Sequence, residues 1–173
     1  MKEEEYNGEN EQWFEFNKRI TIYREGKPYL QRHTLLTFGK WLSFKIHTIL
    51  QSDGECDHDH PWAFITLILK TGYFEWTPVD QKDNGLFIRQ KLGVDGVIEN
   101  CNWHKPYSIM FRPAKWRHRL NLLEQNVVKD GLIRSEVIPA KTFVITGRVV
   151  RDWGFFTESG WKFWKNYEER RDC

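Results

Sequence analysis

Roughly ten short segments along this chain alternate between apolar and polar residues, and turn residues separate them. Such segments are typical of strands, because successive side chains of an extended backbone point to opposite faces. Glycine and proline mark the turns, for example at residues 25–28, 38–40 and 93–96. Only residues 161–171 have the charge and spacing of a helix. The sequence therefore predicts an all-β fold, an antiparallel sandwich or barrel, with one short C-terminal helix.

Two histidines, His58 and His60, lie in the string CDHDHPW at residues 56–62. In an extended segment both imidazoles point to the same face, because side chains alternate with a period of two. An almost wholly apolar run follows at residues 63–69, which is expected for a strand buried on both faces. The pair therefore begins a strand that enters the core.

The neighbours of the two histidines have different roles. Asp57 and Asp59 have the opposite parity, so we expect them to point away and to pair with arginine or orient a neighbouring strand. Pro61 has no backbone N–H donor, which places this stretch at a strand end or sheet edge. The histidine pair is therefore expected near the mouth of a barrel.

A third histidine, His118, follows the string RPAKWR at residues 112–117 and begins a second strand-like run. Leu120 and Leu122 share its parity, whereas Arg117 and Arg119 point the other way. A fold that brings the two strands side by side gathers three imidazoles. Neutral imidazole binds Fe, Zn, Cu and Ni well, so a metal site is the main functional hypothesis.

The spacing of His58-x-His60 with Gly72, and of Pro113-x-Lys115-x2-His118, resembles the two motifs of the small metal-binding cupins. The chain departs from those motifs at Ser52, Ile65, Tyr107, Lys115 and Leu122, where the family has Gly, Glu, Gly, Gly and Asn. It also resembles a cupin family scattered through phage and bacterial genomes, without an assigned function. That likeness spans residues 29 to about 165 and rests on DHDHPW at residues 57–62 and on Tyr29-Leu30-x-Arg32, His47, Gly72-Tyr73-x-Glu75, Arg151-Asp152-Trp153-Gly154-Phe155 and Gly160-Trp161.

The resemblance implies a double-stranded β-helix, the cupin jelly-roll barrel, in a single domain at residues 13–173 after a flexible arm at residues 1–12. It also implies one divalent transition metal, with iron expected first and zinc, nickel or manganese as alternatives. Ile65 cannot bind a metal, so the remaining three-histidine site resembles the iron centre of the thiol dioxygenases. His47 is a candidate fourth ligand or supporting donor, and Glu75 a candidate carboxylate from an adjacent strand.

Candidate residues for chemistry on a substrate are fewer. Tyr73 and Glu75 are the candidate proton-transfer groups. Three arginines and a tryptophan are the candidate substrate contacts, because guanidinium binds carboxylate or phosphate in a bidentate manner and an indole can form a wall beside it. They are Arg112, Arg148, Arg151 and Trp153. His33 and His104 match no motif and are expected to pack or to lie at the surface.

Composition narrows the class of protein. The net charge of +2 is small and the basic residues are dispersed, so a nucleic-acid partner is not expected. The three cysteines show no C-x-x-C spacing, which argues against both a disulfide framework and a cysteine zinc site, and favours a reducing compartment. An acidic N-terminus and the lack of an apolar run of about 20 residues predict a cytoplasmic protein without a membrane partner.

Two functions remain open from the sequence. The first is a mononuclear metal oxygenase, or a related lyase or isomerase, acting on a small molecule. The second is a non-catalytic module that binds a small anionic or sugar-like ligand. Fold resemblance does not decide between them, because one architecture carries many functions. By analogy with the family, a homodimer formed through edge strands is also expected.

Overall fold

The computed structural model describes residues 14–173, except for the side chains of residues 169 and 170. The expected flexible arm at residues 1–12 lies outside the described residues. In the described part, fifteen strands carry nearly all of the regular structure, so the all-β prediction is confirmed. No helix there is long and apolar enough to cross a membrane.

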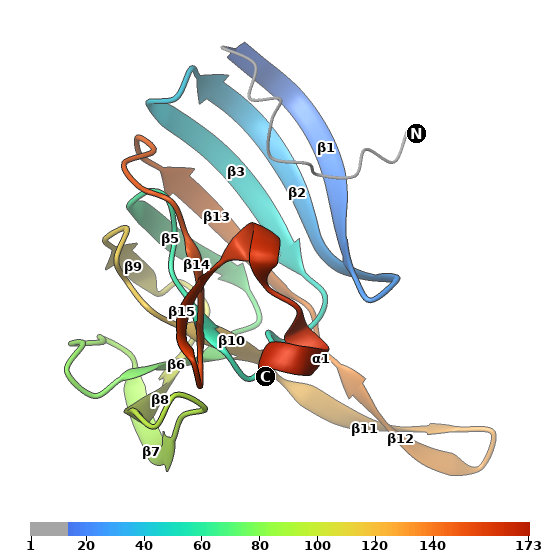
Figure 1. Ribbon diagram of the computed structural model, residues 1–173. Helices are drawn as coiled ribbons and strands as arrows, with labels where there is room; N and C mark the ends of the chain where they lie inside the picture. The colour runs from blue at the N-terminus through green and yellow to red at the C-terminus, as the bar shows by residue number, and fades with distance from the viewer. Residues whose placement is uncertain (1–13) are drawn as a thin grey trace.

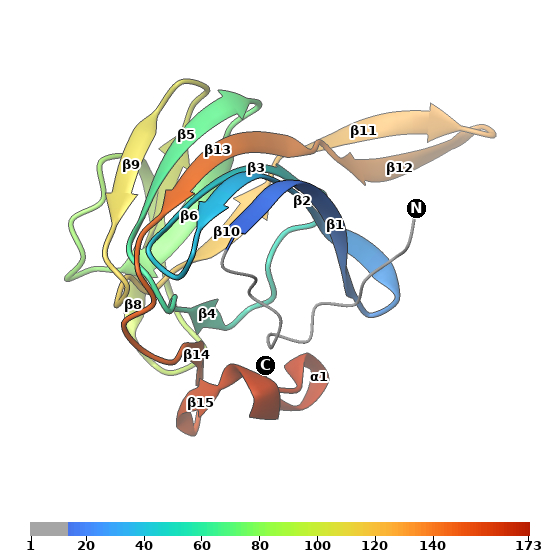
Figure 2. The same ribbon diagram turned by 90° about the horizontal axis from the view of Figure 1, so that it is seen from above.

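Six antiparallel strands form the larger sheet, which is curved (Figures 1 and 2). In their order across the sheet they are β1 (Phe14–Arg24), β2 (Lys27–Phe38), β3 (Leu42–Ile49), β13 (Ala140–Thr146), β5 (Phe64–Lys70) and β9 (Ile109–Arg112). The β1–β2 turn uses Glu25 and Gly26, both with positive φ (51° and 74°), as a tight hairpin between twisted strands requires. The turn predicted at residues 25–28 is thereby confirmed.

Smaller sheets lie on the concave side of the large sheet (Figure 2). One is the three-stranded sheet of β15 (Gly160–Phe163), β14 (Gly154–Thr157) and β4 (Asp57–His58). Another has four strands, β10 (Arg119–Leu122), β6 (Tyr73–Pro78), β8 (Ile98–His104) and β7 (Leu86–Leu92). A separate hairpin of β11 (Glu124–Lys129) and β12 (Leu132–Val137) projects from the body (Figure 1).

The chain passes between the two sides in the order of a jelly roll. Strands β3, β5, β9 and β13 belong to the large sheet. Of the strands that lie opposite, β4 comes between β3 and β5 in sequence, β10 comes between β9 and β13, and β14 follows β13. Strand β4 pairs with β14 on one side and is bridged through His58 to His118 on the other. The sheets stay separate and do not close into one continuous barrel.

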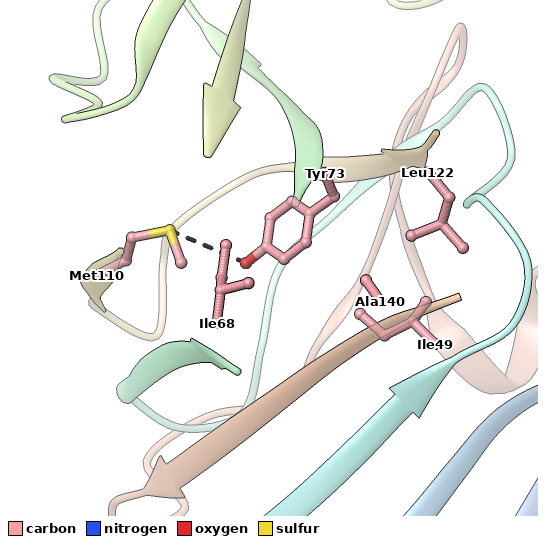
Figure 3. Close-up of a cluster of buried hydrophobic side chains, with 6 residues drawn as sticks. All are labelled: Ile49, Ile68, Tyr73, Met110, Leu122 and Ala140. Atoms are coloured by element: carbon pink, nitrogen blue, oxygen red, sulfur yellow. Dashed lines mark hydrogen bonds between the residues drawn. The ribbon is translucent and has the colours of Figure 1, made fainter. Parts of the chain in front are cut away.

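A small apolar core fills one end of the space between the two sides (Figure 3). Its members come from strands of both sides: Ile49, Ile68, Tyr73, Met110, Leu122 and Ala140. The Tyr73 hydroxyl points to Met110 Sδ at 3.9 Å. Because this core occupies only one end, the other end is available for a cavity.

Three sequence predictions differ from the structure. Residues 161–171 do not form a helix: they begin within β15 and continue into a 3-10 turn, η1 (Trp164–Asn166), and a single helical turn, α1 (Glu169–Asp172). The apolar run at residues 63–69 is not buried on both faces, because Ile65 is 40% exposed on the outer face. A disulfide joins Cys56 to Cys173, although the sequence argued against one, because the fold brings residues 117 positions apart to a Cα–Cα distance of 5.8 Å.

Candidate metal centre

The two histidine motifs meet on neighbouring strands. The backbone N–H of His58 donates to the carbonyl of His118 at 2.8 Å, and the backbone N–H of His118 donates to the carbonyl of His58 at 3.0 Å. The backbone N–H of His60 donates to the carbonyl of Ala114 at 3.2 Å, which ties the first motif to the loop before the second. The convergence predicted from the spacing is therefore present in the fold.

The three imidazoles form a nearly equilateral group. Ring centroids are 5.0 Å apart for His58 and His60, 4.9 Å for His58 and His118, and 5.1 Å for His60 and His118. One ring nitrogen from each lies within 4.8 Å of the others, and Nε2 of His60 is 2.8 Å from Nε2 of His118. Three nitrogens at this separation suit a single ion placed between them.

A buried carboxylate orients His118 from behind. Nδ1 of His118 lies 2.7 Å from Oε1 of Glu75, which is 1% exposed. Donation from Nδ1–H leaves the lone pair on Nε2, directed toward the other two histidines. Metal-binding histidines commonly make this contact through their second nitrogen. Glu75 therefore supports a ligand in this structure and does not itself belong to the histidine group.

Glu75 is held by further donors, which fix its position. Arg112 donates through Nε at 3.1 Å and Nη2 at 2.6 Å, and Trp116 donates through Nε1 at 2.9 Å. Although burial raises the pKa of Glu75, hydrogen bonds from His104 and His118 outweigh it and hold the pKa well below its usual range. The Glu75 carboxylate is thus charged, and both of its oxygens accept hydrogen bonds.

Burial keeps two of the ligand candidates, His58 and His60, neutral. It lowers the pKa of His58 to about 4, and it lowers the pKa of His60 well below the usual value for histidine. Neutral imidazole is the form that binds a metal. The site can thus offer ligand lone pairs at neutral pH.

The aspartates between the histidines point outward and bind arginines, as predicted from their parity. Asp57 accepts from Nε of Arg117 at 2.9 Å and from Nη1 of Arg119, the two residues that flank His118. These ion pairs lie behind the backbone bridge between the two strands. They stabilise the register that puts His58 beside His118.

Asp59 joins the first motif to the C-terminal strands. Its carboxylate accepts from Nη1 of Arg151 at 2.5 Å, from the Gly154 N–H at 2.9 Å and from Nε1 of Trp161 at 3.2 Å. Strand β14 and strand β15 are thereby placed against the metal-site loop. The acidic residues of the motif therefore position the histidines.

A cavity of about 1300 Å³ opens in front of the three histidines. It lies on the concave face of the large sheet and is lined near the site by aromatic rings of Trp62, Phe64 and Trp153. Trp62 stacks on His60 with 5.0 Å between centroids and 12° between planes. The rings restrict water around the histidines and leave one side open to a small molecule.

Outside the histidine group, His47 and Tyr73 line the same cavity, whereas His104 lies in the interior. His47, on β3, lines the same cavity but is not one of the three grouped ligands. Tyr73 also lines the cavity, and burial raises the pKa of its hydroxyl well above the usual value. His104 bonds Glu75 and Asp83 in the interior; burial lowers its pKa, but these carboxylates outweigh it and raise the pKa to about 9.

The predicted substrate contacts divide into two groups. Trp153 lines the cavity, whereas none of the three arginines appears among its described lining residues. Arg112 pairs with Glu75 and Asp83, Arg151 pairs with Asp59, and Arg148 lies over the Trp41 ring at 4.9 Å. The structure therefore does not place these arginines beside the histidine group.

Two cations in the cavity wall escaped the sequence analysis. Arg32 on β2 and Lys45 on β3 both line the cavity. Lys45 shares the parity of His47, so the alternation of residues 41–50 contains a signal. Parity alone does not say which face of β3 lines the cavity; the pairing of β3 with β13 and β2 decides that.

The chemistry available here is that of three imidazole nitrogens that could bind one side of an ion. Such a set leaves coordination positions for water or substrate and suits Fe, Zn, Ni or Mn, in agreement with the resemblance described above. The fixed tautomer of His118 strengthens the fit, since the lone pair is directed before any ion binds.

No protein-family model matches the chain, and no curated protein matches it in sequence. Similar solved structures include FeII HppE, with 12% identity over 83% of this chain and 62% of that chain and a TM-score of 0.46. FeII HppE in complex with substrate has 10% identity over 75% and 56%, with a TM-score of 0.47. An RmlC-like cupin from Ralstonia eutropha JMP134 has 9% identity over 86% and 75%, with a TM-score of 0.46.

The chain thus spans 62% or less of the length of either HppE structure.

Proposed function

We propose that this chain is a metal-dependent enzyme of the cupin type. In this proposal His58, His60 and His118 hold one divalent transition metal, iron first and zinc, nickel or manganese as alternatives. The observation that carries it is the convergence of three imidazoles, with one ring nitrogen from each within 4.8 Å of the others and with His118 held by buried Glu75.

The substrate is a small molecule that enters the cavity beside the histidines. A bound ion would act there as a Lewis acid at the positions that three ligands leave open. Glu75 keeps His118 in place, and Trp62 and Trp153 exclude bulk water from one side of the histidine group. The proposed reaction class is a mononuclear oxygenation, with isomerisation or lyase chemistry as alternatives.

Metal analysis tests the site. We expect purified protein to hold about one transition-metal ion per chain, and His58→Ala and His118→Ala each to lose it, because removal of one of three ligands leaves too few donors. The measurement is elemental analysis of dialysed protein. His33→Ala is the control, since His33 bonds Asn17 at 2.7 Å away from the cavity lining.

Full metal occupancy in both ligand variants would remove the proposed site. Oxygen uptake with a panel of thiols and small organic acids then separates enzyme from binding module. Metal without turnover, together with saturable ligand binding, would favour a non-catalytic module for a small anionic or sugar-like ligand.

A further inference from the structure

The cavity is positively charged along the wall that faces the histidines. Among its described lining residues are four cations, Lys18, Arg32, Lys40 and Lys45, and two acids, Glu15 and Asp53. Glu15 and Lys18 pair with each other at 3.0 Å, and Asp53 accepts from Tyr29 and from the Leu120 N–H. Arg32, Lys40 and Lys45 therefore leave the described lining with a net positive charge. The cavity therefore favours a negatively charged ligand.

Two of these cations stand next to His47 on the concave face. Arg32 on β2 is directly opposite His47 on β3 in the strand register. Lys45 lies two residues before His47, so it projects to the same face of β3. Neighbouring strands are about 4.8 Å apart, so a group with two or three oxygens can reach all three side chains.

His47 itself indicates a ligand. Its Nε2 is buried and, within residues 14–173, has no hydrogen-bond partner. Burial lowers the pKa of His47 well below its usual value, and the neighbouring charges of Arg32 and Lys45 lower it further. A buried polar atom without a partner is uncommon, and here it faces a cavity between two cations.

The same cluster lies close to the histidine group. Nζ of Lys45 is 5.7 Å from the Trp62 ring centroid, and that ring stacks on His60. Lys45 and His60 thus both contact the Trp62 ring and line the same cavity. A small molecule that contacts Lys45 is therefore near the open side of the metal centre.

We propose that Arg32, Lys45 and His47 form a subsite that binds the carboxylate or phosphate group of a small anionic substrate. The fork of Arg32 supplies paired donors, Lys45 a compact charge, and Nε2 of His47 a neutral donor. The remainder of the substrate extends toward the three histidines. This last step rests on the proposed function, whereas the subsite rests on β2 and β3 alone.

Calorimetric titration with inorganic phosphate and with malonate tests the subsite and separates the two oxyanion classes. Protein is titrated as purified and again after dialysis against a chelator, so that binding to a metal does not contribute. We expect Arg32→Gln and Lys45→Gln each to weaken the preferred anion by about tenfold or more, as the loss of a charge-assisted hydrogen bond implies.

Two matched variants remove a charge elsewhere. Arg19→Gln on β1 and Lys141→Gln on β13 alter exposed residues outside the described cavity lining, and both are expected to bind within about twofold of the parent protein. The proposal is overturned if neither anion binds, if Arg32→Gln and Lys45→Gln bind normally, or if all four variants weaken equally.

Metal content measured on the same samples separates this inference from the proposed function. Loss of anion binding with metal retained supports the subsite. Anion binding that depends on Arg32 and Lys45, in protein that holds no metal as purified, leaves the subsite and removes the proposed enzyme. Metal retained with anion binding unaffected by either variant removes the subsite and leaves the metal centre.

Discussion

The carboxylate of Glu75 accepts hydrogen bonds from residues with two different purposes. His118 depends on it for orientation, whereas Arg112 depends on it for compensation of a buried charge. A change at this position therefore combines a loss of stability with a loss of ligand geometry. A second carboxylate, Asp83, allows the two effects to be separated, because it bonds Arg112 and His104 but makes no contact with His118.

We expect Glu75→Gln to lower metal affinity by about 10–100-fold, because the amide no longer fixes the tautomer of His118 as firmly. Asp83→Asn, the matched control, also leaves Arg112 with one carboxylate fewer, so it should reduce stability but keep metal affinity unchanged. Competition with a chromophoric chelator measures affinity, and thermal unfolding measures stability. Equal metal affinity in the two variants would show that Glu75 has no orienting role.

At the scale of elements, the two-residue strand β4 is too short to hold its position by backbone pairing alone. Asp57 anchors one side through Arg117 and Arg119, and Asp59 anchors the other through the N–H of Gly154. Strand β4 is thus fixed between β10 and β14 by charged contacts on the face opposite the ligands. Side-chain alternation allows one short strand to serve both purposes.

Asp57→Asn should lower the free energy of unfolding by about 3 kcal/mol, because it leaves buried arginine charge undercompensated. Glu55→Gln removes a carboxylate from the more exposed Lys91 pair nearby and should change stability by less than about 1 kcal/mol. Urea unfolding of chelator-treated protein provides the comparison. Equal stability of the two variants would mean that the Asp57 contacts do not secure β4.

Strand alternation predicted much of this arrangement. It placed His58, His60 and His118 on one face and the aspartates on the other, and the contacts in the structure agree. These features are local, because the parity of a side chain follows from the sequence alone. The reason for Gly72, the glycine of the first motif, is not local: a Cβ there would collide with the backbone oxygen of His104 on β8.

Features that depend on distant packing were not predictable. Residues 161–171 have helical spacing, yet Trp161 is bound by Asp59 and β15 pairs with β14, so tertiary contacts override local propensity. Arg32 carried no motif of its own beyond a short resemblance, and only the β2–β3 pairing places it opposite His47. The sequence thus predicted that the three histidines share a face, whereas it did not predict which residues line the cavity.

At the scale of the whole molecule, the disulfide between Cys56 and Cys173 fastens the C-terminal segment next to the metal-site strand. A crosslink across so long a loop restricts the unfolded chain and typically stabilises a fold by about 2–4 kcal/mol. The crosslink also keeps β14 and β15 near β4, on which His58 depends.

Reduction of this bond should lower the melting temperature by roughly 5 °C or more for a chain of this size. Cys173→Ser should melt at that lower temperature and no longer respond to the reductant. Both proteins are compared after metal removal, since thiols bind metals. An unchanged melting temperature of the parent protein on reduction would contradict a stabilising role.

The bridge between His58 and His118 joins positions 60 residues apart. Strand β4 also pairs with β14, which lies almost a hundred residues further along the chain. Such pairings form late and slowly, because a long loop must lose conformational entropy before the contacts between the strands contribute favourable free energy. A nascent or partly collapsed chain therefore offers an ion only scattered, weak sites. Under the proposed function, ion binding would therefore require that β4, β10 and β14 have already come together.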